Sequence, residues 1–266
     1  MVFCWFFFNP IPIFYLYQVN FREKEDRNMK ARRQKSISVG MMIVALLAVG
    51  MVMALYTPAR AADREQVQLL VDRARLTFND FIHDSNYAWL HENIHHAKGV
   101  LIFPQVIKGG FIWGGSGGTG VFLARDERTG IGDEPAFYTI GSVTFGLQIG
   151  GESAEVVMLA MTHKAIDSLL SSSVKLGGDV SITVGPVGAG AQANPGVPNV
   201  TADFVSFAKS KGLYAGLDLQ GSVIAVRDSL NTAYCGRNVR PADIIAKRDC
   251  SNRGADQLRE ALRRAA

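Results

Sequence analysis

The pattern of apolar and polar residues is clearest in Leu176–Ala191, where alternation is combined with frequent glycine. Val180, Ile182 and Val184 are separated by polar residues, which predicts a strand with one buried face. Gly185-Pro186 then interrupts the pattern, and a proline cannot donate a hydrogen bond to a central ladder. Alternation resumes at Val187, so the stretch predicts a strand, a bend and a second strand.

A second stretch, residues 98–125, combines β-branched and aromatic residues with seven glycines between Gly109 and Gly120. Both features are typical of strands that bend or approach another backbone closely. The stretch predicts three strands and one flexible link: Val100–Phe103, ended by Pro104; Gly109–Trp113; Gly120–Ala124; and the link Gly114–Thr119.

The N-terminal part of the remaining chain has helical periodicity. In Asp63–Ser85, apolar residues recur every three or four positions and charged residues occupy the other face, which predicts an amphipathic helix. The further predicted helices are Tyr87–Lys98, one that Thr162 caps and that runs to Ser173, Pro241–Lys247 and Ala255–Arg264. The further predicted strands are Ala136–Gly150, Glu155–Met161, Phe204–Lys209, Tyr214–Asp218 and Ser222–Arg227.

These elements predict an α+β fold. Most connections between strands are too short for parallel crossovers, which need a dozen or more residues. We therefore expect a curved, mainly antiparallel sheet, barrel-like in its curvature, with N-terminal amphipathic helices, one central helix and short C-terminal helices. The expected divisions are helices at 62–97, a β-rich core at 98–236 and a helical tail at 237–266.

The charge distribution separates the first 61 residues from the rest. They hold 8 of the 28 basic residues and 3 of the 24 acidic ones, so the remaining chain is nearly neutral. Nucleic-acid binders carry a clustered positive field, which this composition does not provide, and we expect no nucleic-acid partner.

The leader resembles a secretory signal peptide. Residues 1–28 fit neither a signal nor a core and are interpreted as an upstream start assigned too early. From Met29 the chain has a basic segment, an apolar run from Ile37 to Leu55 and an A-x-A pattern ending at Ala61. We therefore expect a signal peptide at 29–61 and an exported protein, periplasmic or associated with the outer envelope. An uncleaved membrane anchor is the alternative, because 19 residues can just span a bilayer.

Export to an oxidising compartment changes the interpretation of the cysteines. Cys235 and Cys250 are the only two after the leader, and an even pair in an oxidising compartment predicts a disulfide. Two unpaired thiols are the alternative.

Two motifs point to chemistry that their context does not support. His91-Glu92-Asn93-Ile94-His95 matches H-E-x-x-H, which binds zinc when both histidines share one face of a helix. Here the predicted helix stops within a turn, at Gly99, so a zinc hydrolase is only an alternative and we expect no metal. Gly115–Gly120 matches G-x-G-x-x-G, but it opens a strand rather than a helix, so we expect no nucleotide site.

Four ordered motifs carry a family resemblance. They are Ala97–Pro104, the Gly109–Gly120 stretch, Leu176–Val180 with Gly185–Gly188, and Ser210–Gly216 with Gln220–Ser222. Over about Asp63 to Gly236 the chain resembles the SYLF family. The resemblance implies phospholipid binding, actin binding in yeast members, no enzyme activity and no cofactor. One departure is Tyr234-Cys235-Gly236, where the family often has a tyrosine pair before the glycine.

The expected function is therefore that of an exported, non-enzymatic protein that binds envelope phospholipid. Apolar and aromatic groups beside a lysine are suited to the headgroup boundary of a membrane. The candidate lipid-binding residues are Ile107, Lys108, Phe111 and Trp113, whereas Phe103 is better explained by core packing. A structural or partner-binding envelope module without a lipid site remains an alternative.

Overall fold

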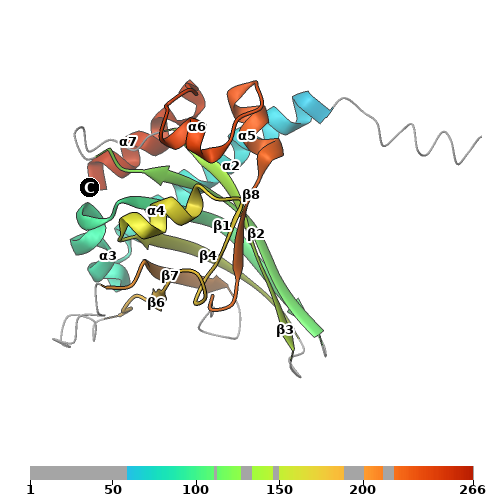
Figure 1. Ribbon diagram of the computed structural model, residues 1–266. Coiled ribbons are helices and arrows are strands. Elements are labelled where there is room, and N and C mark those ends of the chain that lie inside the picture. The colour runs from blue at the N-terminus through green and yellow to red at the C-terminus, as the bar shows by residue number, and fades with distance from the viewer. Residues whose placement is uncertain are drawn as a thin grey trace, which may run out of the picture. The chain divides into compact units, whose positions relative to one another are not determined.

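One eight-stranded sheet organises the fold (Figure 1). The structure is a computed structural model that describes residues 59–110, 113–126, 134–145, 150–188, 201–211 and 219–265. The strand order is β5-β8-β3-β2-β1-β4-β7-β6. The strands are β1 (Gly99–Gly110), β2 (Trp113–Ala124), β3 (Ala136–Phe145), β4 (Gly150–Ala160), β5 (Ser173–Lys175), β6 (Ile182–Val184), β7 (Phe204–Lys211) and β8 (Val223–Val226).

The topology confirms the predicted α+β class. Neighbouring strands pair antiparallel throughout, except that β6 runs parallel to β7. The sheet is strongly curled and stays open, with β5 and β6 at its two edges (Figure 1).

Helices cover both faces of the sheet at one end. The helical elements are α2 (Ala59–His83), η1 (Ser85–Tyr87), α3 (Ala88–Asn93), η2 (Ile94–His96), α4 (His163–Leu169), α5 (Asp228–Cys235), α6 (Pro241–Ile245), η4 (Arg253–Ala255) and α7 (Asp256–Ala265). Tyr138 points to the α4 face and donates to the Leu169 carbonyl, at 2.7 Å. On the other face, α2 buries Phe78 and Phe81, as its amphipathic pattern predicts.

The two strand breaks predicted in residues 98–125 were wrong. β1 continues through Pro104, because a bulge between Ile102 and Gln105 removes this position from regular pairing. β2 continues through Gly114–Thr119, which was expected to be a flexible link. These residues pair with β1 on one side and with β3 on the other, so the flanking strands hold the glycines in an extended conformation.

Other predictions need correction. The helix that Thr162 caps ends at Leu169, and Ser173, its expected end, begins β5 instead. The expected strand Gly109–Trp113 is divided between the end of β1 and the start of β2. The expected helix Tyr87–Lys98 is divided into η1, α3 and η2. The helix α5 was not predicted at all, although Gly236 ends it in the left-handed conformation that favours glycine. In Leu176–Ala191 only β6 is a named strand within the described residues; positions 189–191 lie outside them.

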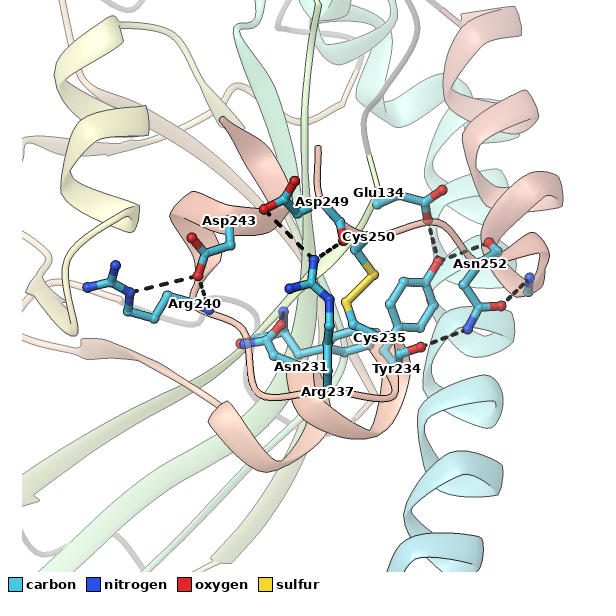
Figure 2. The surroundings of a disulfide bond; sticks show 12 residues. Glu134, Asn231, Tyr234, Cys235, Arg237, Arg240, Asp243, Asp249, Cys250 and Asn252 are labelled. Carbon is cyan, nitrogen blue, oxygen red and sulfur yellow. Dashed lines mark hydrogen bonds and ion pairs between the residues drawn. A yellow bond between two sulfur atoms is a disulfide. The ribbon is translucent and has the colours of Figure 1, made fainter. Parts of the chain in front are cut away.

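A disulfide joins the end of α5 to the segment before η4 (Figure 2). It links Cys235 and Cys250, the pair expected from the cysteine count, across a Cα–Cα distance of 5.5 Å. Beside it the Tyr234 hydroxyl donates to Glu134, at 2.6 Å, and the Asn252 side chain donates to the Tyr234 carbonyl, at 3.0 Å. Burial, together with the nearby Glu134 carboxylate, raises the pKa of Tyr234, which therefore stays protonated.

The predicted leader lies outside the described residues, apart from the first turn of α2. Within the described part of the chain, no helix is both long and apolar enough to cross a membrane. The predicted strand Tyr214–Asp218 also lies outside the described residues.

Candidate functional site

The central four strands extend past the helices that cover the rest of the sheet, and this extension is the candidate site (Figure 1). Residues paired across antiparallel strands share a face. One row joins Ile140, Gly118, Val106 and Ala154, and its three larger side chains are buried on the face that α4 covers. Successive rows alternate between this inner face and an outer face.

The outer face of the extension is nearly bare of side chains. One row on it is Gly141, Gly117, Ile107 and Ser153, and another is Val143, Gly115, Gly109 and Gly151. Ile107 is 57% exposed and Val143 is 82% exposed. The outer face therefore presents two apolar side chains on a sheet of glycine backbone.

Packing within the described residues does not require three of these glycines, whereas Gly115 is tighter, because a Cβ there would lie 3.2 Å from the Ser142 carbonyl oxygen. A Cβ at Gly117 would lie 3.9 Å from its nearest neighbour, one at Gly141 3.6 Å and one at Gly151 4.0 Å, all ordinary contacts. By contrast, a Cβ at Gly120 would lie 2.4 Å from the Ile102 carbonyl oxygen, and one at Gly118 2.4 Å from that of Gln105. Gly118 and Gly120 are thus explained by the bulge in β1, whereas Gly117, Gly141 and Gly151 leave room for a larger side chain on the outer face.

This difference predicts contrasting effects of alanine on stability. Gly120→Ala is expected to lower the free energy of unfolding by about 1–3 kcal/mol or more, because backbone and the Phe103 ring must move. Gly117→Ala is expected to change it by less than about 0.5 kcal/mol. Urea unfolding of both variants measures this, and equal losses would contradict the assignment.

The helix α2 extends the outer face. Leu76 is 54% exposed and, with Arg73, lines a cleft of about 480 Å³ against Gln105 and Ser153. Ser153 is the direct cross-strand partner of Ile107, so the cleft continues into the glycine rows. We call Leu76, Arg73, Ile107, Val143 and the glycines between them the outer surface.

The inner face of the extension is polar. Ser142, Ser116, Lys108 and Glu152 form one row across the four strands. The Ser116 and Ser142 hydroxyls are 2.7 Å apart, and the Oε1 of Glu152 is buried without a hydrogen-bond partner among the described residues. Lys108 therefore faces away from Ile107.

The remaining candidate lipid-binding residues lie in different environments. Phe103 is fully buried, as core packing predicts. Phe111 lies outside the described residues, and Trp113 is the first residue of β2, where it pairs with Phe145 of β3. The exposed apolar residues Val143 and Leu76 were not identified from the sequence as site residues, because their exposure depends on what the rest of the chain covers.

The H-E-x-x-H motif does not lie on one α-helix. His91 is in α3, which ends at Asn93, and His95 is in the 3₁₀ turn η2. The Nε2 of His91 is 2.9 Å from the Phe81 carbonyl oxygen, and the ring of His95 lies 3.9 Å from that of His96. Among the described residues there is no cluster of three or more metal-ligating side chains.

Comparison with known proteins assigns the domain. A family model described as "Las17-binding protein actin regulator", Ysc84, matches residues 141–265. The chain carries a Ysc84-family domain. This is the SYLF family, so the resemblance inferred from the sequence is confirmed. The matched residues include Val143 of the outer surface and all elements from β4 to α7.

Curated relatives of this Ysc84 domain come from yeasts and animals. The chain is 36% identical over 155 residues to an SH3 domain-containing protein of Schizosaccharomyces pombe, covering 58% of this chain and 34% of that protein. It is 32% identical over 168 residues to Protein YSC84 of Saccharomyces cerevisiae, covering 62% and 35%. It is 32% identical over 153 residues to SH3 domain-containing YSC84-like protein 1 of Pongo abelii, covering 57% and 44%.

The chain thus spans less than half the length of these relatives. The names of two of them describe SH3 domain-containing proteins, and the family description names an actin regulator; neither describes an enzyme. No solved structure matches the chain.

Proposed function

We propose that this Ysc84-family protein is a non-enzymatic module that binds phospholipid membranes through the outer surface. The observation that carries the proposal is the exposure of Ile107 and Val143 on glycine-lined strands, beside Leu76 and Arg73 of α2. A face with few side chains brings the sheet backbone close to a membrane, while the apolar residues enter the headgroup boundary.

The energies are adequate for reversible binding. Fully burying an isoleucine, leucine or valine side chain contributes about 1.5–3 kcal/mol. A basic residue near an anionic bilayer adds about 1 kcal/mol, and Arg73 lies beside Leu76. Three partly buried apolar side chains and one arginine thus give weak, salt-sensitive association.

Vesicle co-sedimentation of residues 62–266, the form expected after removal of the signal peptide, tests the proposal, because the apolar run Ile37–Leu55 would itself bind a bilayer. The double variant Ile107→Asp, Val143→Asp is expected to bind vesicles of phosphatidylcholine and phosphatidylglycerol at least about tenfold more weakly, since each tenfold step corresponds to about 1.4 kcal/mol. Val184→Asp is the matched control, because Val184 is 63% exposed on β6.

Equal binding by wild type and the double variant would overturn the outer surface as the contact site. Absence of wild-type binding to both anionic and neutral vesicles would overturn lipid binding altogether.

A protein partner is the second candidate for the same surface. The family description and the names of relatives such as LAS seventeen-binding protein 3 favour it. A domain that fails to bind vesicles, but whose complex with a partner is disrupted by Ile107→Asp, would support this candidate.

Export to the cell envelope is part of the proposal. The basic segment, apolar run and A-x-A pattern of residues 29–61 support it, as does the cysteine pair after the leader. Fractionation of cells that express the full chain tests it: an envelope protein whose mass corresponds to residues 62–266 is expected.

A further inference from the structure

The groove between α2 and α7 differs in chemistry from the outer surface. It encloses about 880 Å³ and is lined from α2 by Arg75 and His83 and from α7 by Arg263, Arg264 and Glu260. Figure 1 places α7 at the end of the sheet away from the extended strands, so this groove and the outer surface are separate.

The groove holds more arginine than its carboxylates can pair. Arg259 is paired with Glu134, at 3.2 Å, and with Asp256, at 3.5 Å. Arg263 and Arg264 share the single carboxylate of Glu260, at 2.9 and 3.3 Å. The two pairs with Glu260 join exposed side chains and therefore contribute little to stability, so a ligand anion can compete for Arg263 and Arg264.

Arg75 supplies the observation that points to a ligand. Its Nε is buried and has no hydrogen-bond partner among the described residues. A buried donor left unpaired costs free energy. Basic residues in the last turn of α7 are explained by the carbonyl end of the helix dipole, but Arg75 lies in the interior of α2, eight residues before its end.

We propose that the α2–α7 groove binds a phosphate group, with Arg75, Arg263 and Arg264 as donors. A guanidinium presents several N–H groups in a planar fork that matches phosphate oxygens, and one phosphate can accept from more than one arginine. The volume leaves room for more than a phosphate, which suits a phosphate carried by a larger molecule, either a soluble phosphoester or a phospholipid headgroup.

Calorimetry with pyrophosphate and the full chain tests the site. Wild type is expected to bind, and Arg75→Gln to bind at least about tenfold more weakly, the effect of losing one charge-assisted hydrogen bond. Arg73→Gln is the control on the same helix, since Arg73 lines the other cleft. Arg264→Gln adds a variant that cannot affect folding greatly, because this side chain is 75% exposed.

Vesicles of phosphatidylcholine with and without phosphatidic acid separate the two sources of phosphate. Pyrophosphate binding that Arg75→Gln and Arg264→Gln weaken supports a soluble phosphoester. Binding to phosphatidic acid vesicles that the same variants weaken, without pyrophosphate binding, supports a headgroup. If neither variant changes either measurement, or if wild type binds neither probe, the site is overturned. Ile107→Asp leaves pyrophosphate binding unchanged, so failure here is distinguishable from failure of the outer surface.

Discussion

Replacing Cys235 and Cys250 together by serine is expected to lower the free energy of unfolding by about 3 kcal/mol. The bond closes a loop across a sequence separation of 15 residues and ties the end of α5 to the segment that leads into α7. Without it the unfolded chain gains conformational freedom, and the helices that cover this end of the sheet lose their covalent anchor. Urea unfolding followed by tryptophan fluorescence measures the difference.

Reduction of the wild-type protein provides the control. Reduced wild type and the double serine variant are expected to have similar unfolding midpoints, because both lack the cross-link. A loss below about 1 kcal/mol in both would contradict the assigned role, whereas a loss in the variant alone would indicate that serine is tolerated poorly at the buried position of Cys250.

The second large effect is expected at Asp203. This carboxylate is only 6% exposed and accepts hydrogen bonds from the Thr162 hydroxyl at 2.6 Å, the Ser181 N–H at 2.8 Å and the Ser181 hydroxyl at 2.9 Å. It thereby connects the start of α4, the segment before β6 and the start of β7. Asp203→Ala is expected to cost about 3 kcal/mol, since three donors lose their partner. Thermal or urea unfolding measures the loss.

Asp203 also predicts a dependence of stability on pH. Burial alone would raise its pKa, but the hydrogen bonds from Thr162 and Ser181 and the charge of Lys164 outweigh burial and lower it. Because its pKa is lower in the folded state, Asp203 makes its full contribution to the free energy of unfolding above its pKa in the unfolded chain, about 3.9. That contribution is lost as the pH falls through the folded-state pKa.

The acid sensitivity of Asp203→Asn tests whether the pKa of Asp203 is lowered in the folded state. The wild type is expected to lose more stability between pH 6 and pH 3 than Asp203→Asn does. Asp167→Asn serves as control, because this carboxylate is exposed on α4. A steeper acid loss in Asp203→Asn than in the wild type would show that the pKa is raised instead.

Local pattern predicted most elements correctly where one face of an element is buried. The amphipathic helix after residue 62, the Thr162 cap and the helices at Pro241 and Ala255 depend on contacts within a few residues, and each is present. The errors occur where long-range pairing overrides the local signal. In the local sequence Pro104 indicates the end of a strand. In the structure β2 and β4 flank β1 on both sides, and Pro104 is accommodated in a bulge.

The predictions of site residues show the same difference between what local pattern reveals and what long-range packing decides. Ile107 could be identified as a contact candidate from its position beside the glycine-rich stretch, and it is exposed. Lys108 lies on the opposite face of β1 from Ile107, because neighbouring residues of a strand point to opposite faces. His91 and His95 satisfied a spacing rule, but the helix changes type between them.

The sequence by itself determined the α+β class, the antiparallel pairing, the family and the cysteine pair, because periodicity, connection length and composition are local properties. Only the tertiary structure decided which glycines are required by packing and which leave a face open. It also decided that Leu76 lines a cleft with Ser153, the cross-strand partner of Ile107, and that Arg75 lines a groove with the arginines of α7. Exposure and unpaired donors depend on segments far apart in the chain, so no local pattern can reveal them.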